Sequence, residues 1–225
     1  MNKKVDFNTY SKNYNDLLKQ QHRKFGDISY YSQYKVNILK KYTPNNQSLK
    51  ILEYGCGIGR NLTYLQKNYP NSDIYGFDIS EDSIKTAKKE NPKVIFIEED
   101  SFHNLYNFFD IVFVAGVYHH IPLKVRDKVT KNIHSLLKND SLCIIFEHNP
   151  FNPVTRHMVN TCEFDADAIL LKKKELIKLF IDNQFLLKKS QYTLFLPPRL
   201  KFLNFIEDTI GWLPLGGQYY IVVQK

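Results

Sequence analysis

Cysteine is scarce in this sequence, and its placement argues against two kinds of cysteine site. The chain has 225 residues and three cysteines, Cys56, Cys143 and Cys162, which lie far apart and form no Cys-x-x-Cys pair. Because zinc sites and disulfide frameworks need closely patterned cysteines, we predict neither, and we expect no bound metal. Cys143 lies inside an apolar segment, which predicts an inert core thiol.

Long hydrophobic runs are also missing. No window approaches the roughly 20 uninterrupted apolar residues that a membrane span needs. The first residues, Met1 to Asp6, are not followed by the apolar stretch of a secretory signal. We therefore expect a cytoplasmic protein without a membrane span. The hydrophobic content of 43% predicts a globular chain, and its length predicts a single domain.

Acidic residues are fewer than basic ones, which gives a formal net charge of +8. Such an excess can indicate a nucleic-acid partner. The lysines, however, are spread over most of the chain, with dense runs only at 172–174 and 188–189. We therefore favour a solvated lysine-rich surface and do not expect nucleic acid as a partner.

Three of the nine glycines fall in one stretch, from Ile51 to Arg60. The stretch predicts a buried strand that runs into a glycine turn and then into a helix over 61–68. This arrangement brings backbone N–H groups against a nucleotide-like ligand. Glycine suits the turn because its φ angles are closed to other residues and because a Cβ would hold the ligand away. From this stretch alone, a tight turn without a ligand is the alternative.

The glycines are spaced Gly-x-Gly-x-Gly, and Glu53 stands two places before the first of them. A pyrophosphate at the helix N-terminus disfavours a neighbouring carboxylate, whereas a ligand with a cationic or amino group suits one. The motif resembles the first motif of the class I S-adenosylmethionine-dependent methyltransferases. The resemblance implies S-adenosylmethionine as cofactor, with Glu53 near its methionine part and Gly55, Cys56, Gly57 and Gly59 around its body.

Two acids follow the next two predicted strands. Asp78 lies about twenty residues after the last glycine, at the separation where a second-strand carboxylate reaches a ribose. A helix cap is the alternative role for Asp78. In the resembling family an acid after the third strand, expected here over 93–98, accepts a hydrogen bond from the adenine amine. This implies Asp100, with Glu99 as the alternative. The expected cofactor site also includes Tyr14, Ile79, Ser101 and Gly116.

A fourth strand is expected over 109–114, and it runs into Gly116-Val117-Tyr118-His119-His120. This stretch resembles the fourth methyltransferase motif, which lines the pocket beside the reactive methyl group. The Asn/Asp-Pro-Pro-Tyr motif of many amino-methylating enzymes is missing here. No nucleophilic cysteine follows the strand either. Methylation of nucleic-acid bases is therefore disfavoured.

The fifth predicted strand, 142–146, ends at Glu147, and the segment 149–171 after it is an insertion into a minimal core. Its two Asn-Pro steps favour a turn, and a short helix is expected around 155–160. A loop of this length is usually a binding loop or lid, so we expect it to contact the substrate. The pattern Glu-His-Asn-Pro-x-Asn-Pro, followed by Phe-Asp-x-Asp-Ala, resembles a subgroup of bacterial class I methyltransferases. Many members of that subgroup are linked to polysaccharide or secondary-metabolite pathways.

Two helices are expected ahead of the glycine motif, over 5–21 and 31–42, because apolar residues recur there three and four apart. We therefore expect a helical cap over 1–46 and the methyltransferase core over 47–225. Tyr10 and Tyr14 resemble a Tyr-x-x-x-Tyr pattern of the family's capping helices. A packed helix face explains these tyrosines equally well.

The alternation of strands and helices predicts an α/β fold, a doubly wound sheet with ligands at the carboxyl ends of its strands. The resemblance implies a Rossmann-like seven-stranded sheet that is mostly parallel. Its antiparallel last strand, expected at 218–223, would enter between strands five and six.

Because the cofactor carries its own leaving group, the enzyme mainly has to align an acceptor. A hydroxyl acceptor also needs a base, and His119 and His148, together with Glu147, are the expected catalytic residues. We expect methyl transfer to a hydroxyl or amine of a small polar metabolite, such as a sugar or a natural-product intermediate. An RNA or protein methyltransferase and an inactive cofactor-binding protein are the alternatives. The expected substrate site comprises Tyr10, Tyr118, His120, Asn149 and Arg156.

Overall fold

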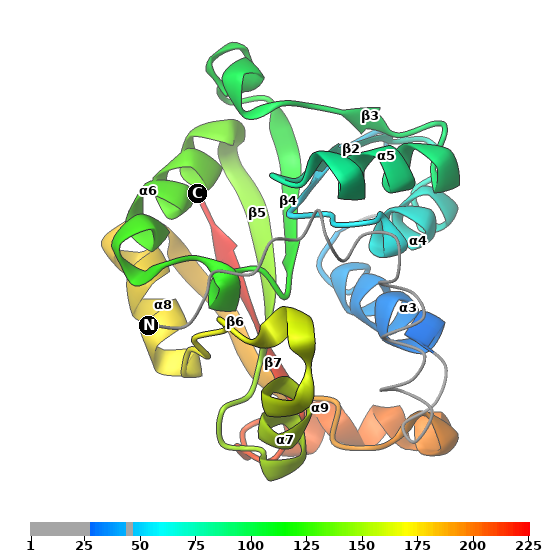
Figure 1. Cartoon of the computed structure of the whole chain (residues 1–225), viewed down its shortest axis with the longest axis vertical. Helices are drawn as coiled ribbons and strands as arrows, with labels where there is room; N and C mark the ends of the chain where they lie inside the picture. The colour runs from blue at the N-terminus through cyan, green and yellow to red at the C-terminus, as the bar shows by residue number, and fades with distance from the viewer. Residues whose placement is uncertain (1–27, 44–46) are drawn as a thin grey trace.

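A computed structural model describes residues 28–43 and 47–225 of the chain. One seven-stranded sheet runs through these residues in the order β3-β2-β1-β4-β5-β7-β6 (Figure 1). Strand β7 is antiparallel to both of its neighbours, and the other paired strands are parallel. This confirms the Rossmann-like α/β fold and the place of the last strand. The strands are β1 (Lys50–Tyr54), β2 (Asp73–Phe77), β3 (Ile95–Phe96), β4 (Phe109–Ala115), β5 (Leu137–His148), β6 (Leu186–Thr193) and β7 (Gln218–Gln224).

Helices cover both faces of the sheet, with α3, α4 and α5 on one face and α6 and α8 on the other (Figure 1). The longer helices are α3 (Ile28–Leu39), α4 (Arg60–Asn68), α5 (Glu81–Glu90), α6 (Leu123–Leu136), α7 (Pro153–Thr161) and α8 (Lys173–Asp182). The short ones are α9 (Glu207–Ile210) and the 3-10 helices η1 (Glu99–Asn104), η2 (Tyr118–His120), η3 (Glu163–Asp165) and η4 (Pro198–Ile206). In the described part of the chain, no helix is long and apolar enough to cross a membrane.

The central strands are buried on both sides, which explains why they read as continuous apolar runs. On β1 and β4, Leu52 and Val112 pack with α6 and α8. Their chain neighbours Ile51 and Ile111 point to the opposite face and pack with α3 and α4. The edge strand β3 is shorter than the expected 93–98, because only Ile95 and Phe96 pair with β2.

The insertion after β5 contains the helix expected around 155–160, which is α7. Asn152 caps this helix by accepting a hydrogen bond from the backbone N–H of Thr155 at 2.9 Å, and Pro153 occupies the first helical position. Of the two expected N-terminal helices, the second is α3. The first, with Tyr10 and Tyr14, lies outside the described residues.

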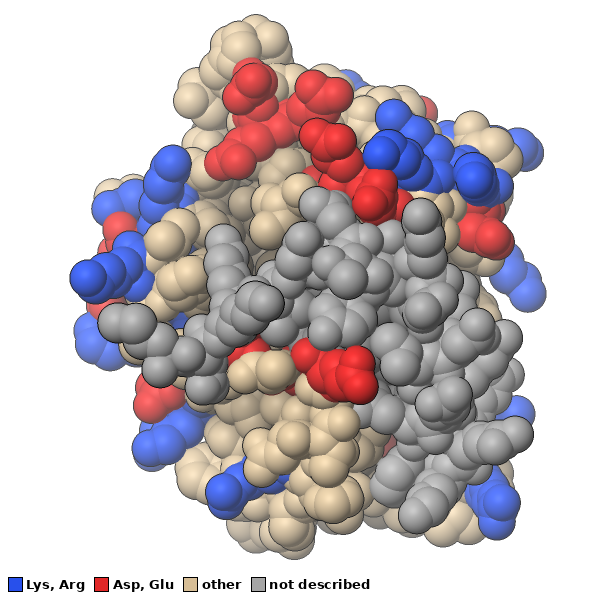
Figure 2. All heavy atoms as spheres, viewed as in Figure 1, with Lys and Arg blue, Asp and Glu red and all other residues tan. Residues whose placement is uncertain are grey.

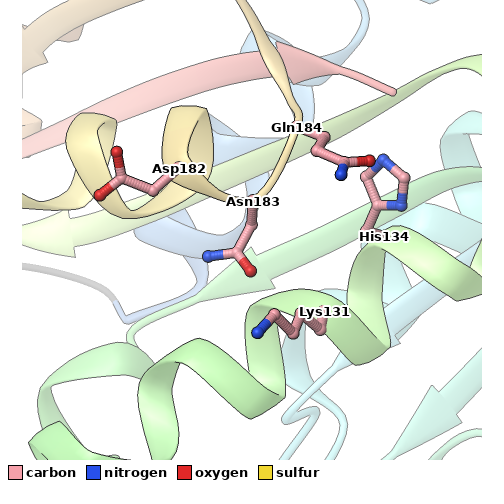
Figure 3. Close-up of a pocket in the computed structure, with 5 residues that line it drawn as sticks. All are labelled: Lys131, His134, Asp182, Asn183 and Gln184. Atoms are coloured by element: carbon pink, nitrogen blue, oxygen red, sulfur yellow. The ribbon is translucent and has the colours of Figure 1, made fainter.

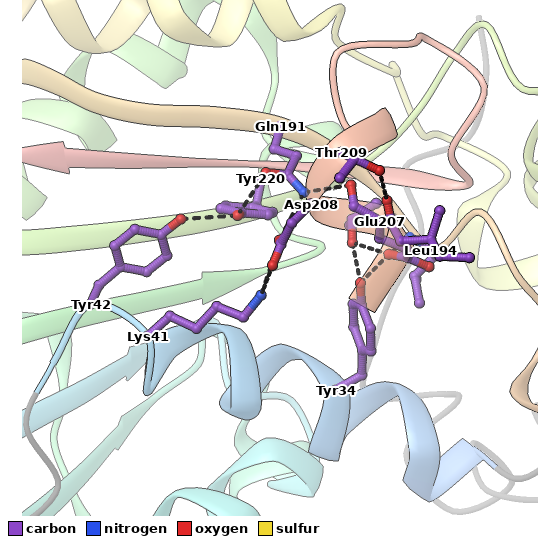
Figure 4. Close-up of polar contacts among 11 residues, drawn as sticks. Tyr34, Lys41, Tyr42, Gln191, Leu194, Glu207, Asp208, Thr209 and Tyr220 are labelled. Carbon is purple, nitrogen blue, oxygen red and sulfur yellow. Dashed lines mark hydrogen bonds and ion pairs between the residues drawn. The ribbon is translucent and has the colours of Figure 1, made fainter. Parts of the chain in front are cut away.

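A buried carboxylate joins α3 to the end of β6. Glu207 is 2% exposed and accepts hydrogen bonds from the backbone N–H groups of Leu194 at 3.0 Å and Phe195 at 3.1 Å. The hydroxyls of Thr193 and Tyr34 also donate to it (Figure 4). Because one carboxylate satisfies donors from two elements, it anchors the helix that packs over the glycine turn.

We predict that Glu207→Ala lowers the free energy of unfolding by at least ~2 kcal/mol, because several buried donors lose their acceptor. The adjacent Asp208, which forms an exposed 2.7 Å ion pair with Lys41, provides the control. Asp208→Ala should cost less than about 1 kcal/mol. Urea denaturation measures both values, and equal losses would contradict the role given to Glu207.

Candidate functional site

The glycine turn joins β1 to α4 at the carboxyl edge of the sheet. The backbone N–H groups of Gly55 and Cys56 both donate to the carbonyl of Phe77 at 2.8 Å, which holds the turn against the end of β2. Gly57 donates its N–H to Asp78 Oδ2 at 2.7 Å. The turn and the first acid after it are thus directly bonded.

Gly55, Gly57 and Gly59 all have positive φ angles, of 76°, 52° and 83°. A Cβ on Gly55 would lie 2.5 Å from a methyl group of Val117, and one on Gly59 would lie 2.5 Å from Asn91 Nδ2. A Cβ on Gly57 would meet nothing within 4 Å. The outer glycines are therefore needed for packing as well as for backbone conformation, whereas Gly57 borders open space.

Glu53 lies at the end of β1 and is 1% exposed. Its Oε1 accepts a 2.6 Å hydrogen bond from Asn61 Nδ2, while Oε2 has no hydrogen-bond partner among the described residues. Burial raises the pKa of Glu53 to about 8, against the opposing effects of Asn61 and of Lys35 on α3. Burial also lowers the pKa of Lys35 to about 8. Glu53 therefore places a buried carboxyl oxygen, which no described residue contacts by a hydrogen bond, at the carboxyl edge of the sheet.

The second acid, Asp78, uses its other oxygen to accept the backbone N–H of Ser80 at 2.9 Å. Burial raises the pKa of Asp78 despite these backbone hydrogen bonds. Ile79 follows it and is 73% exposed, an unusual state for a large apolar side chain. Asp100 and Ser101 lie in η1, where Asp100 is exposed and the Ser101 hydroxyl donates to the carbonyl of Glu98 at 2.6 Å.

Glu147, at the end of β5, binds the segment that follows β4. Its Oε1 accepts the backbone N–H groups of Val117 at 3.0 Å and Tyr118 at 2.7 Å. Its Oε2 lies 2.6 Å from Nδ1 of His119. Gly116, with a φ of 72°, makes the bend before η2. The carboxylate is 1% exposed and fully engaged, so its geometry is that of a positioning residue.

The two histidines of η2 face the insertion. Asp165 Oδ1 lies 3.8 Å from Nε2 of His119 and 3.4 Å from Nε2 of His120. Asp167 Oδ1 lies 3.4 Å from the other ring nitrogen of His120. The backbone N–H of Ile169 donates to the carbonyl of His119 at 2.7 Å. These contacts bring the insertion against the end of β4.

Neighbouring histidines have opposite protonation behaviour here. Burial alone would lower the pKa of His119, but the carboxylates of Glu147 and Asp165 raise it to about 10. His148, whose ring centroid lies 5.0 Å from that of His119, has its pKa lowered to about 4 by burial and by the charge of His119. At neutral pH the imidazole of His148 is therefore neutral and a weaker base than an exposed histidine.

Two residues expected to bind substrate, Tyr118 and Asn149, have side chains that are engaged outside this cluster. Tyr118 is fully buried, its hydroxyl lies 2.9 Å from Thr130 Oγ1, and its ring packs against the α8 side of the core, which corrects the expectation of a pocket residue. Asn149 is also fully buried and donates to the carbonyls of Pro214 and Gly216, so it holds the approach to β7. Arg156 is exposed on α7.

Four residues of this region were not predicted as site residues: Lys35, Asn61, Asp165 and Asp167. The two aspartates belong to the Phe-Asp-x-Asp-Ala pattern, which is the sequence signal that could have selected them. Asn61 lies in the first turn of the helix after the glycine motif, where its type and position are ordinary. Nothing in the sequence around Lys35 marks it.

A separate surface pocket lies between the C-terminal ends of α6 and α8 (Figure 3). It is lined by Lys131, His134, Asp182, Asn183 and Gln184. Because α6 starts near the carboxyl end of β4 and ends where β5 begins, this pocket is at the opposite edge of the sheet. It contains no residue of the predicted site.

We predict that Gly55→Ala destabilises the chain more than Gly57→Ala. Both substitutions place a Cβ at positive φ, which costs roughly 1–2 kcal/mol. Only Gly55→Ala adds a clash, with Val117. Chemical denaturation of both variants without ligand measures the difference, and an equal loss of stability would show that Val117 yields to the added methyl group.

Comparison with known proteins identifies the family. A sequence model of the methyltransferase domain family matches residues 45–194. An uncharacterized protein of Rickettsia prowazekii is 24% identical over 201 residues, which cover 81% of this chain and 80% of that protein. A carboxy-S-adenosyl-L-methionine synthase of Nautilia profundicola is 35% identical over 160 residues, which cover 69% of this chain and 58% of that enzyme.

Solved structures share the fold. A S-adenosylmethionine-dependent methyltransferase from Archaeoglobus fulgidus has a TM-score of 0.67 at 16% identity, covering 91% of this chain and 97% of its own. Phosphoethanolamine N-methyltransferase 2 of Haemonchus contortus, solved with S-adenosyl-L-methionine, has a TM-score of 0.65 at 16% identity, covering 98% of this chain and 60% of its own. With the family match over 45–194, we conclude that the chain belongs to the methyltransferase domain family and is a class I enzyme that uses S-adenosylmethionine.

Proposed function

We propose that the enzyme transfers a methyl group to a hydroxyl, or to an amine, of a small polar metabolite such as a sugar or a natural-product intermediate. The observation that carries this proposal is the compact group of His119, His120, His148, Asp165 and Asp167 beside the carboxyl ends of β4 and β5. Such a dense set of donors and acceptors suits a polar acceptor of limited size.

The residues at the ends of β1 and β2 fit the cofactor. Glu53 Oε2, which no described residue contacts by a hydrogen bond, suits the amino group of the methionine part, and the open space beside Gly57 admits the body of the molecule. Asp78 Oδ1 and Oδ2 each accept one backbone N–H, and a carboxylate oxygen has a further lone pair for a ribose hydroxyl. The exposed side chain of Ile79 offers an apolar surface to the adenine ring.

Bound S-adenosylmethionine supplies a methyl group attached to a sulfonium, and the sulfonium sulfur is the leaving group for that methyl group. The chain's residues then have to orient the acceptor. His148 is neutral at pH 7 but is a weaker base than an exposed histidine. His119 is bonded to Glu147 and faces Asp165, so it serves to position the segment after β4.

Surface charge favours a small acceptor over RNA. On the face shown in Figure 2, acidic side chains gather near η1 and the end of β3, while the lysines and arginines lie toward the edges. A polyanion needs a continuous basic path for its phosphates. Although the net charge is +8, the lysines and arginines of the described residues that this face displays form no such path.

We predict that Asp78→Asn weakens S-adenosylhomocysteine binding by about 10- to 100-fold, because hydrogen bonds to a charged acceptor are worth roughly 1.5–3 kcal/mol. Asp73→Asn, an exposed position at the other end of β2, is the matched control and should bind like the wild type. Calorimetry gives the three affinities. Unchanged binding by Asp78→Asn would remove Asp78 from the cofactor site.

A second prediction concerns Glu53, whose pKa of about 8 exceeds the ordinary value near 4.3. At pH values between these two pKa values, Glu53 takes up a proton when the chain folds. Glu53 therefore lowers the free energy of unfolding progressively as pH rises from about 4.3 to 8. Glu53→Gln removes this penalty, and its melting temperature without cofactor should exceed that of the wild type at pH 8 by a few degrees. A gain of about 1 kcal/mol corresponds to ~2–4 °C.

At pH 5 the gain of Glu53→Gln should be small, while its affinity for S-adenosylhomocysteine should be reduced at both pH values. Thermal melts and calorimetry on the same samples check these points. A variant that is equally stabilised at pH 5 and pH 8 would show that ionisation of Glu53 is not the cause.

The acceptor class is tested with methyl-labelled S-adenosylmethionine and a cell extract separated into small-molecule, RNA and protein fractions. We expect label in the small-molecule fraction with the wild type and none with Asp78→Asn. Label confined to RNA or protein would establish the competing acceptor class. Cofactor binding without label in any fraction would favour an inactive binding protein.

A further inference from the structure

Three potential metal ligands converge where the insertion meets the end of β4. One ring nitrogen of His119, one of His120 and a carboxylate oxygen of Asp165 all lie within 4.8 Å of one another. They come from η2 and η3, two elements more than forty residues apart in the chain. We propose that these three residues form a binding site for a divalent transition-metal ion of the zinc type.

The distances fit tetrahedral coordination. With metal–ligand bonds of about 2.1 Å, two ligands of a tetrahedral zinc ion lie roughly 3.4 Å apart. Asp165 Oδ1 lies 3.4 Å from His120 Nε2 and 3.8 Å from His119 Nε2. Small side-chain rotations are therefore enough to bring all three atoms around one ion. Two imidazoles and one carboxylate are also the ligand types that zinc, iron(II) and cobalt(II) accept.

Each histidine is oriented by a carboxylate on its other ring nitrogen. Glu147 Oε2 lies 2.6 Å from Nδ1 of His119, and Asp167 Oδ1 lies 3.4 Å from Nδ1 of His120. Metal-binding histidines in proteins usually have such a partner, which sets the tautomer and aims the free nitrogen at the ion. Here both partners leave Nε2 directed at Asp165.

The charges also favour a cation. Three carboxylates, those of Glu147, Asp165 and Asp167, lie within 4 Å of the ring nitrogens of His119 and His120. The side chains are well shielded, with 2% of His119, 18% of His120 and 11% of Asp165 exposed. An ion would displace the proton that His119 shares with its carboxylates, as ligation of histidine requires.

Among the described residues, three protein ligands leave a fourth position open, which is the arrangement of catalytic rather than structural zinc sites. The cluster adjoins the bend at Gly116, whose added Cβ would lie 3.6 Å from the ring of His119, so the open position is near the end of β4. We assign the ion the role of binding the acceptor hydroxyl, whose pKa it would lower. This assignment rests on the proposed function, whereas metal binding itself does not.

In the transfer step the O–H bond of the acceptor breaks and its proton passes to water. The oxygen lone pair forms the new O–CH3 bond as the C–S bond of the sulfonium breaks. The bonding pair stays on sulfur, which leaves as the neutral thioether.

The test is a titration of the chelator-treated 225-residue chain with Zn²⁺, and with Co²⁺ as a spectroscopic probe. We expect one tightly bound Zn²⁺ per chain and a Co²⁺ absorption band of tetrahedral intensity. Asp165→Asn and His120→Gln should each weaken Zn²⁺ binding at least 100-fold. Asp167→Asn, which removes only the orienting carboxylate, should weaken it about 10- to 100-fold.

His157→Gln is the matched control, since His157 is exposed on α7 and outside the cluster, and it should bind Zn²⁺ like the wild type. S-adenosylhomocysteine calorimetry on the same proteins reports the cofactor site separately. If Asp165→Asn and His120→Gln bind Zn²⁺ as tightly as the wild type does, the metal site is overturned and the proposed function is left intact. If Asp165→Asn or His120→Gln is too unstable to measure, Asp167→Asn serves as the test variant. A Co²⁺ spectrum and a Zn²⁺ affinity of Asp167→Asn that are unchanged from the wild type would also overturn the site.

Discussion

The carboxylate of Glu147 is the interaction on which the site depends. It is buried at the end of β5 and binds two backbone N–H groups and one imidazole of the segment after β4. Those three bonds fix the segment after the Gly116 bend, which carries His119 and His120. The insertion is held to that segment through Asp165. It is also held to α6 through Arg126, whose guanidinium donates to the carbonyl of Ile169 at 2.9 Å.

The proposed cofactor half of the site could be outlined from sequence because its signals are local. The glycine spacing, the acid before it and Asp78 after it each follow from one strand and the turn beside it. The doubly wound sheet then brings their carboxyl ends together, as its observed strand order shows. The same logic predicted the helix after Pro153, where a cap and a proline define the first turn.

The acceptor half was predicted less well because it depends on packing between distant segments. Asp165 and Asp167 reach the histidines only when the insertion folds back over η2, and no short pattern encodes that contact. Tyr118 was wrongly expected in the pocket because a 3-10 turn rotates successive side chains by about 120°. Its ring therefore enters the core while its two neighbours face the insertion.

The position of β7 has a consequence for how the chain folds. This last strand, residues 218–224, lies between β5 and β6 and supplies every hydrogen-bonded neighbour that β6 has within the sheet. During synthesis, β6 therefore has no partner in the sheet until residues 218–224 leave the ribosome, and the long sequence separation of these pairs slows their formation. Loss of β7 would expose unpaired edges on both β5 and β6, which are prone to aggregation.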